Sequence, residues 1–454
     1  MTTETAQRRR LVIVDGSRRH DIAVPASAAV GDALSAVGLR LQSGRDVLLE
    51  TDGREIDPTS RIDQLRDGAV VVLVDLARVA PRRARTADRP AGLTGGAWWF
   101  VGGVGALLAV LTIAAPGALD PATRQIAGFA TAAAALVAGV VFAARVSSRQ
   151  QQPSVPVIGI LLLAFGSGAA CVPDLPAATT VLAVFTGLMS AAAAAAVMGV
   201  ISRSPSLSAE VRAAMVVLLV LAAVWGTALI VHLDAASAAA VTLGLGPVAY
   251  RVLVSSLVDV APGTFIDYAR FQTTRWSVRQ QMPEEVHSID ADDADALVAR
   301  STARLTAGTF ALVTAAAAAA PAAFPSLVSD DPLVFAGRIA LAVTVVLAFM
   351  LGARKSTVPS TRWMLRIGAA AVVGAVLGAV IPTADAGLLS LLAGGCLVVG
   401  AATAFLVIPA GRGVNSLRWS RAGDGFEWIA VALSLPASLL AANAVDVVRG
   451  MMAA

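Results

Sequence analysis

Long apolar runs separated by short polar joints make up most of the chain. They follow one another as Ala97–Ala115, Gln125–Ala144, Pro156–Cys171, Ala177–Ile201, Val211–His232, Ser237–Val258, Ala307–Phe324, Leu333–Leu351, Met364–Ile381, Ala386–Ile408 and Trp428–Val448. A helix needs roughly 20 mainly apolar residues to cross a hydrocarbon core of about 30 Å. In lipid each backbone N–H and C=O must be paired within its own segment, so every run should be helical. The pattern predicts an all-α polytopic membrane domain of about eleven transmembrane helices over residues 97–454.

The sign of the charge alternates from one joint to the next. One set of joints carries the cations Arg145, Arg149, Arg203, Arg212, Arg251, Arg270, Arg275, Arg279, Arg300, Arg354, Lys355, Arg362, Arg366, Arg412, Arg418 and Arg421. The opposite set carries Asp120, Asp174, Asp234, Asp330, Asp331 and Asp385, with only Arg124 and Arg338 against them. Joints rich in Arg and Lys stay cytoplasmic, so the pattern predicts an N-in/C-out topology with a periplasmic C-terminus.

The composition agrees with a membrane protein that has a soluble part. Of the 454 residues, 57% are hydrophobic and 15% are charged, whereas soluble domains have about 25% charged residues. The net charge of +4 is small, so the placement of the cations is more informative than their total.

A small α/β domain is predicted at residues 1–76, before the membrane part. Four segments have the residue pattern of strands: Leu11–Val14, His20–Val24, Asp46–Glu50 and Ala69–Val74. The last of these is apolar on both faces, so we expect it to be central in the sheet. Ser27 is the expected N-cap of a short helix that reaches Val37.

This order of hairpin, helix, strand, turn and strand resembles the ubiquitin-like β-grasp fold. The resemblance follows Asp46–Leu49, Gly53–Asp57, Ile62–Leu65 and Val70–Val74. Ubiquitin conjugation needs a free C-terminal diglycine, whereas here Leu76 continues into Ala77 and Arg78. The resemblance therefore implies a fixed cytoplasmic module, most simply a docking domain. The alternative is a domain that only caps the membrane part.

A basic linker joins this domain to the first apolar run, at residues 77–96. Prolines and glycines break regular structure there, and arginines crowd it: Arg78, Arg82, Arg83, Arg85 and Arg89. Cations beside a transmembrane helix attract anionic membrane lipids by about 1 kcal/mol each. Nucleic acid is not an expected partner, because the linker has no interleaved aromatic residues and no nucleic-acid-binding fold beside it.

A long cytoplasmic loop is expected at about 259–302. Its aromatic residues lie among arginines, at a spacing that places several of them along one helical face: Phe265, Tyr268, Phe271 and Trp276. Two interpretations stand beside each other, an interfacial amphipathic helix and a docking platform for a partner. The acidic stretch Ser288–Asp295 fits the start of a helix that leads into the seventh span.

Nothing in the chain has the pattern of an active site. Metal-ligand spacing is absent from the three scattered histidines His20, His232 and His287. Gly166–Gly168 lies inside an apolar run and not after a strand, so it is no phosphate-binding loop. No nucleophile–base arrangement is visible. We therefore predict neither an enzyme nor an ATPase, no cofactor and no metal.

Two functions stay open for the membrane part, a scaffold and a small-molecule permease with a regulatory head. Ion-coupled carriers keep ionisable residues near the bilayer centre, but those within or beside the runs lie near run ends: His232, Arg338, Arg366, Glu427 and Asp446. Small-residue segments suit close helix packing or oligomerisation: Ala191–Ala196, Ala315–Ala320 and Gly374–Gly378. These observations favour the scaffold.

The whole arrangement resembles the EccD family, the multi-span core component of the type VII (ESX) secretion system of actinobacteria. The resemblance covers the ubiquitin-like head, the basic linker, the spans and the loop before the seventh span. It implies a subunit of a cell inner (plasma) membrane complex with EccB, EccE, an EccC-type ATPase and a second EccD copy. The head and the loop would then dock the ATPase, while the spans form the membrane scaffold.

Overall fold

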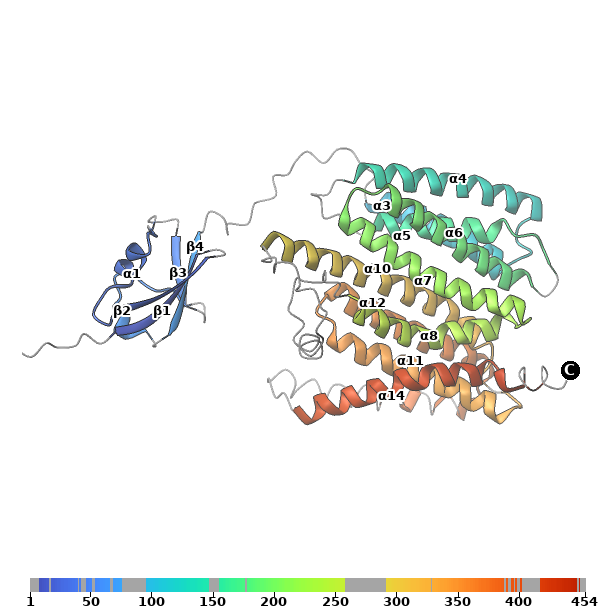
Figure 1. Cartoon of the computed structure of the whole chain (residues 1–454). Coiled ribbons are helices and arrows are strands. Elements are labelled where there is room, and N and C mark those ends of the chain that lie inside the picture. The colour runs from blue at the N-terminus through green and yellow to red at the C-terminus, as the bar shows by residue number, and fades with distance from the viewer. Residues whose placement is uncertain are drawn as a thin grey trace, which may run out of the picture. The chain divides into compact units, whose positions relative to one another are not determined.

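A small sheet precedes a helical bundle along the chain, as the computed structural model in Figure 1 shows. The structure describes residues 8–15, 18–39, 41, 46–50, 54–65, 68–75, 95–146, 155–175, 178–257, 291–327, 329–387, 389–390, 393–395, 397, 401, 417–446 and 449. The chain divides into two compact units, the first built around the sheet and the second around the helices that follow it.

The head contains a four-stranded mixed sheet in the order β2-β1-β4-β3. Its strands are β1 (Arg8–Asp15), β2 (Arg18–Pro25), β3 (Asp46–Glu50) and β4 (Ala69–Asp75). Strand β1 pairs antiparallel with β2 and parallel with β4, and β3 pairs antiparallel with β4. The four predicted strands are therefore confirmed, and the last one lies inside the sheet as its two apolar faces indicated.

One face of the sheet forms the core of the head. Helix α1 (Val30–Ala36) and the 3-10 turn η1 (Ile62–Gln64) supply the rest of this core. Its fully buried members are Leu11, Ile13, Val30, Ala33, Leu34, Leu48, Ile62 and Val71. The alternate strand residues, which point to the other face, are half-buried and do not belong to the core: Val12, Val14, Val47, Leu49, Val70, Val72 and Val74.

The prediction that Ser27 caps the head helix is wrong. Helix α1 begins at Val30, its N-cap is Ala29, and no side chain accepts a hydrogen bond there. Backbone carbonyls of a distant loop take the first amides instead: Val30 N–H donates to Ser60 O at 3.0 Å and Gly31 N–H to Pro58 O at 2.8 Å. The tertiary fold thus pairs the orphan helix amides that a capping side chain would otherwise take.

The second unit is mostly helical. Its helices are α3 (Gly95–Ile113), α4 (Pro121–Arg145), α5 (Val155–Ala170), α6 (Thr179–Ile201), α7 (Pro205–Ile230), α8 (Ala235–Ser255), α10 (Ala291–Ala323), α11 (Pro332–Lys355), α12 (Pro359–Val380), the short η2 (Ile381–Thr383) and α14 (Leu417–Ala441). Among the described residues, nine helices are long and apolar enough to cross a membrane. Helix α5, with 16 residues, is shorter.

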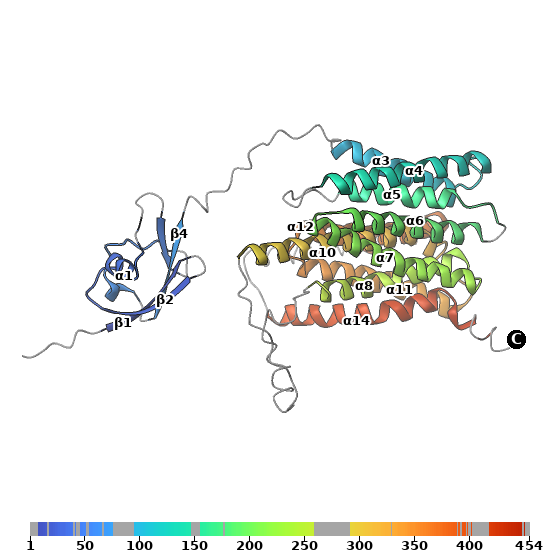
Figure 2. The same cartoon turned by 45° about the horizontal axis from the view of Figure 1, so that its top comes forward.

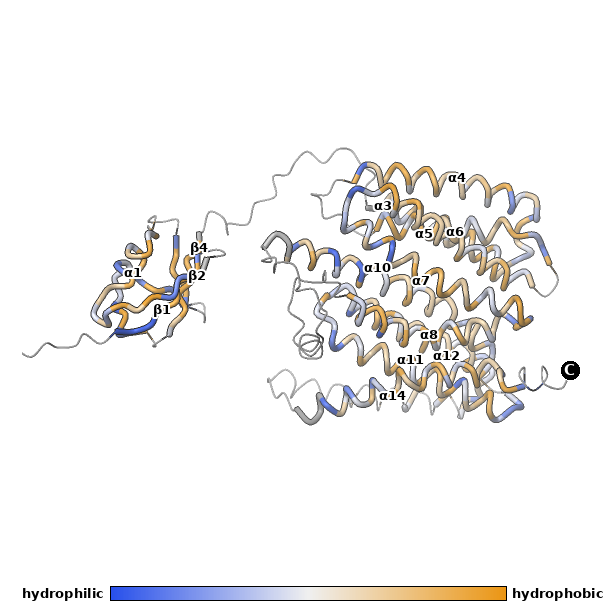
Figure 3. Tube along the Cα trace, viewed as in Figure 1, coloured by the Kyte–Doolittle hydropathy of each residue, from blue (hydrophilic) through white to orange (hydrophobic). Residues whose placement is uncertain are grey.

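Ten of the predicted apolar runs coincide with these helices, namely the nine long ones and α5. The run Ala386–Ile408 is described only in short pieces. Helix α10 begins at Ala291, so part of the loop expected at about 259–302 is helical, with Asp292 and Asp293 in its first turn. Figure 3 shows apolar residues along most of each helix and hydrophilic ones mainly towards the ends.

Several aspartates of the acidic joints begin the helices that follow them. The carboxylate of Asp120 accepts from Ala122 N–H at 3.2 Å, and that of Asp234 from Ser237 N–H at 3.1 Å. The Asp331 carboxylate accepts from Leu333 N–H at 2.8 Å. These carboxylates satisfy amide groups that have no partner within the helix, and they lie at the positive end of the helix dipole.

Glycines let the first helices of the bundle approach closely. Helices α3, α4, α5 and α6 lie side by side in both views (Figure 2). A Cβ on Gly159 of α5 would lie 2.6 Å from the carbonyl O of Trp98 in α3, and one on Gly166 would overlap the carbonyl of Gly105. Gly168 faces Gly187 of α6 in the same way. The Gly166–Gly168 segment is therefore a helix-packing surface, as is common between membrane helices.

Candidate functional site

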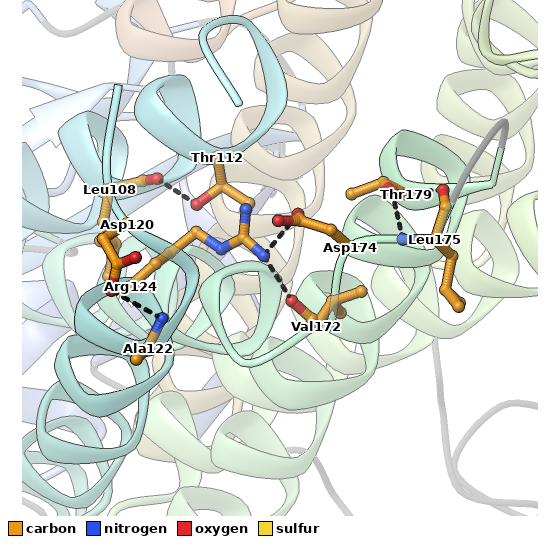
Figure 4. A network of polar contacts seen from close by, with 9 residues as sticks. All are labelled: Leu108, Thr112, Asp120, Ala122, Arg124, Val172, Asp174, Leu175 and Thr179. Carbon is orange, nitrogen blue, oxygen red and sulfur yellow. Dashed lines mark hydrogen bonds and ion pairs between the residues drawn. The ribbon is translucent and has the colours of Figure 1, made fainter. Parts of the chain in front are cut away.

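A buried arginine joins the start of α4 to the segment that follows α5, in the first half of the bundle (Figure 4). Arg124 lies in the first turn of α4, and its side chain is 1% exposed. Its Nη2 donates to the Val172 carbonyl at 2.8 Å and lies 2.8 Å from the carboxylate of Asp174, both just after α5. Thr112 near the end of α3 lies in the same region and donates to Leu108 O at 2.8 Å. A fully buried guanidinium is stable only when it is paired.

The two partners of this ion pair differ in exposure. The Asp174 side chain is 47% exposed, so water can solvate its carboxylate. The Arg124 guanidinium has no such access, and its Nε and Nη1 have no acceptor among the described residues. The pair therefore holds the start of α4 against the end of α5, and the free energy of this contact depends on the carboxylate being present.

A second ionic group joins α8, α11 and α14. We call it the Glu427 cluster and define it as Arg251, Arg354, Lys355, Asp424 and Glu427. Arg251 Nη1 donates to Glu427 Oε1 at 3.1 Å, and Lys355 Nζ lies 2.8 Å from Glu427 Oε2. The second contact is an ion pair without hydrogen-bond alignment, since Oε2 makes no hydrogen bond among the described residues.

Asp424 completes the Glu427 cluster one helical turn away from Glu427. Its Oδ1 accepts from Arg354 Nη2 at 2.6 Å and lies 3.2 Å from Lys355 Nζ. Arg354 and Lys355 are the last two residues of α11, where cations are favoured by the negative end of the helix dipole. The cluster thus fixes the end of α11 to the first part of α14.

Two exposed tryptophans of the helical unit each have an arginine guanidinium over the ring. The Arg251 guanidinium lies 4.5 Å from the ring centroid of Trp428 in α14. Arg366 lies 5.2 Å from the ring centroid of Trp363, both in α12. Trp428 is 57% and Trp363 is 61% exposed. Tryptophan is enriched at the membrane–water interface, where its ring contacts lipid at the headgroup level.

Sequence reasoning found the charges of these two groups but not their partners. Arg124 stood out as a cation in an acidic joint, and Glu427 as an ionisable residue near a run end. The predicted last run began at Trp428, whereas α14 begins at Leu417, which places Glu427 inside a helix and in contact with two others. The presence of opposite charges on different runs indicated that ion pairs could form. Which residues pair could be known only from the packing of the helices.

The site residues predicted from the sequence are not among the described ones. This holds for the aromatic loop residues Phe265, Tyr268, Phe271 and Trp276 and for the linker arginines Arg78, Arg82, Arg83, Arg85 and Arg89. Cys171 is a free thiol, and Cys396 lies outside the described residues. In the part of the chain that the structure describes, no three His, Cys, Asp or Glu side chains come together as a metal site.

Comparisons with known proteins agree with this architecture. The EccD-like transmembrane domain family matches residues 88–451. Protomer 1 of the ESX-3 core complex has a similar structure, with a TM-score of 0.51 and 18% identity over 97% of this chain and 100% of that chain. A chain of the MycP5-free ESX-5 inner membrane complex, State II, aligns with a TM-score of 0.46 and 14% identity over 88% of this chain and 99% of that one. A comparison with curated proteins gives no match.

The first structural likeness concerns the fold alone, because the identity is low. The family match is independent of it and extends from the basic linker to the last turn of the chain. It covers every described transmembrane helix, both ionic groups and the glycine contacts of α3 and α5. The chain is therefore a multi-pass membrane protein that belongs to the EccD family.

Proposed function

We propose that this protein is a non-enzymatic scaffold subunit of a type VII (ESX) secretion complex in the cell inner membrane. The family match over residues 88–451 is the observation that carries the proposal. The name of the similar structure, a protomer of the ESX-3 core complex, supports a role within a multi-subunit assembly. The charge-free middle parts of the spans support a scaffold, because a carrier would need ionisable residues along its pathway.

The finer topology is part of this proposal. The membrane domain has about eleven spans, with the N-terminal head in the cytoplasm and the C-terminus in the periplasm. The alternation of charge between the joints supports this orientation. Nine described spans, together with the short α5 and the run Ala386–Ile408, are compatible with that number.

The head is the proposed docking site for an EccC-type ATPase, which would supply the energy that the scaffold lacks. The strand order β2-β1-β4-β3, with β1 parallel to β4, supports a ubiquitin-like β-grasp fold. The sheet face opposite α1 supports a binding role, because its aliphatic residues lie outside the head core: Val12, Val14, Val47, Leu49, Val70, Val72 and Val74. EccB, EccE and a second copy of this chain are the other proposed partners.

Co-purification of the ATPase tests the docking role. The full-length chain, a variant without residues 1–76 and the variant Val12→Asp/Val72→Asp are purified in detergent from cells that contain the other components. We expect both variants to recover at least about tenfold less ATPase. The deletion removes the proposed docking surface, and the double variant places two charges on the sheet face opposite α1, where the complex would have to desolvate them. Circular dichroism of the purified proteins checks that the head stays folded.

Ser27→Asp is the matched control for this experiment. Ser27 is exposed and lies just before α1. It does not belong to the sheet face that carries Val12 and Val72. It should recover as much ATPase as the unchanged protein. Undiminished recovery with the head-deleted protein would remove the proposed docking role of the head.

A further inference from the structure

The Glu427 cluster has one buried carboxylate, that of Glu427, while its cations and Asp424 are partly exposed. The Glu427 side chain is 6% exposed, whereas Arg251, Lys355 and Arg354 are 35%, 37% and 41% exposed. Within the cluster, three cations lie against two carboxylates. Among these partners, Glu427 is the one whose burial holds Arg251 and Lys355 in position. The outer flank of the cluster therefore holds the partly exposed cations of Arg251 and Lys355 in fixed positions.

Arg251 has donors to spare on this flank. An arginine guanidinium has five N–H groups. In Arg251, Nη1 donates a hydrogen bond to Glu427, and the guanidinium lies over the ring of Trp428. No other acceptor for Arg251 is present among the described residues. A guanidinium that is oriented in this way matches the oxygens of a phosphate group, which it can bind through two parallel hydrogen bonds.

The surface beside Arg251 suits a lipid rather than a soluble anion. Trp428, Ile429 and Leu433 of α14 are 57%, 57% and 51% exposed. Ile429 and Leu433 are one helical turn apart and lie deeper in the span than the charges of Asp424 and Glu427. Val252, next to Arg251 in α8, is 60% exposed as well. A phosphate at Arg251 would thus lie beside Trp428, on helices whose exposed apolar side chains can contact acyl chains.

We propose that the exposed flank of the Glu427 cluster binds the phosphate of an anionic phospholipid, with Arg251 as the main donor and Trp428 beside it. An anionic headgroup is favoured over a zwitterionic one, because the ammonium group of a zwitterionic headgroup would be repelled by Arg251 and Lys355. The exposed apolar face of α14 receives the acyl chains. The choice of the cytoplasmic leaflet rests on the proposed topology, whereas the site itself rests on the contacts within this chain.

Native mass spectrometry of the delipidated full-length protein tests the site. The protein is titrated with phosphatidylglycerol, with phosphatidylcholine and with inorganic phosphate in separate arms. We expect at least about tenfold tighter retention of phosphatidylglycerol than of phosphatidylcholine, because both lipids offer a phosphate but only phosphatidylcholine brings an ammonium group close to the Arg251 and Lys355 cations. Inorganic phosphate should bind weakly, because it lacks the acyl chains. Equal retention of both lipids, or equal binding of inorganic phosphate, would overturn the proposal.

Two variants and a control assign the binding to this place. Arg251→Gln should weaken phosphatidylglycerol retention about tenfold, while Lys355 still pairs with Glu427. Trp428→Leu keeps the ion pairs and should weaken retention by a smaller factor. Arg366→Gln is the matched control, since Arg366 also stacks on an exposed tryptophan but is not part of the cluster. Unchanged retention in Arg251→Gln, or an equal loss in Arg366→Gln, would refute the site.

A negative result in the lipid test would not affect the docking proposal, and a negative result in the co-purification test would not affect the lipid site. Lipid retention depends on α8, α11 and α14, whereas ATPase recovery depends on the head. Loss of lipid binding in Arg251→Gln with an unchanged thermal unfolding midpoint separates a binding role from a purely structural one.

Discussion

Arg124 and Asp174 form one ion pair, but they contribute unequally to stability. The buried guanidinium keeps its charge when the carboxylate is removed, whereas the half-exposed carboxylate can be solvated when the guanidinium is removed. We expect Asp174→Ala to reduce the free energy of unfolding by about 3 kcal/mol and Arg124→Met to change it by less than about 1 kcal/mol. Thermal unfolding in detergent measures both.

The double variant and an exposed pair complete this experiment. Arg124→Met/Asp174→Ala should be as stable as Arg124→Met alone, because the uncompensated charge is gone. Asp446→Ala breaks a pair whose side chains are 69% and 52% exposed, and should cost less than about 0.5 kcal/mol. If Asp174→Ala reduced the free energy of unfolding as little as Asp446→Ala, the proposed role of the Arg124–Asp174 pair in holding α4 against α5 would be wrong.

Asp57 makes the stability of the head depend on acidity. Its carboxylate accepts from the Thr59 hydroxyl at 2.6 Å and from the Thr59 N–H at 2.8 Å, and these bonds lower the pKa of Asp57 below its ordinary value of 3.8. The folded state therefore favours the ionised form. Its contribution is complete above the unfolded pKa and is lost as the pH falls through the lower, folded pKa.

Thr59→Val tests this dependence in the head fragment, which has its own core. The unchanged fragment should have a higher unfolding midpoint than Thr59→Val near pH 7, and the difference should shrink as the pH falls through the lowered, folded pKa of Asp57. Carboxylate NMR of Asp57 should give a lower pKa in the unchanged fragment than in the variant. A difference in the midpoints that is constant with pH would show that the carboxylate does not take part.

Glycine contacts determine how closely the two helices α3 and α5 pack against each other. A Cβ on Gly105 would overlap the backbone of Leu162, whereas one on Gly103 of the same helix meets no described atom within 4 Å. Gly105→Ala should destabilise the protein by about 2 kcal/mol or more through overpacking. Gly103→Ala should be neutral or stabilising by up to about 1 kcal/mol, because alanine favours the helix.

Thermal unfolding of the two alanine variants distinguishes a packing effect from a propensity effect. Both change one glycine of α3 to alanine, so helix propensity changes equally. Only the position relative to α5 differs. Equal unfolding midpoints for Gly103→Ala and Gly105→Ala would contradict the close contact of these helices.

Apolar runs predicted which segments are helical but not where the helices begin. Helix α7 begins at Pro205, six residues before the predicted Val211, and α14 begins at Leu417 rather than Trp428. Hydropathy reports immersion in lipid, whereas a helix begins where its first amides find partners, such as Ser204 at α7. Runs of apolar residues therefore locate a span well and its polar first turns poorly.

Long-range contacts explain what the sequence could not predict. The strands of the head follow from local alternation, and the interior position of β4 follows from its two apolar faces. The cap of α1 could not be read locally, because the carbonyls of Pro58 and Ser60 replace a side chain. The partners of Arg124 and Glu427 are 48 or more residues away along the chain, so residue type alone indicated a charge but not a contact.

The whole molecule combines a small sheet-containing head, which has its own core, with a membrane part whose helices pack closely against one another. Two ionic contacts join its helices: Arg124 in the first turn of α4 pairs with Asp174, and Glu427 within α14 pairs with Lys355 at the end of α11. Glycine, alanine and serine contacts fill the helix interfaces between them. This construction suits a subunit that keeps its shape while another protein supplies the energy.

Cysteine labelling of membrane-intact cells tests the central claim that the head and the long connection before α10 face the cytoplasm, where an ATPase can reach them. Single cysteines replace Ser27, Arg270 and Arg449 in a chain whose Cys171 and Cys396 are serine. We predict that an impermeant maleimide labels Arg449→Cys at once, but Ser27→Cys and Arg270→Cys only after permeabilisation. Labelling of Ser27→Cys and Arg270→Cys from opposite sides of the membrane would contradict the topology and the docking role that depends on it.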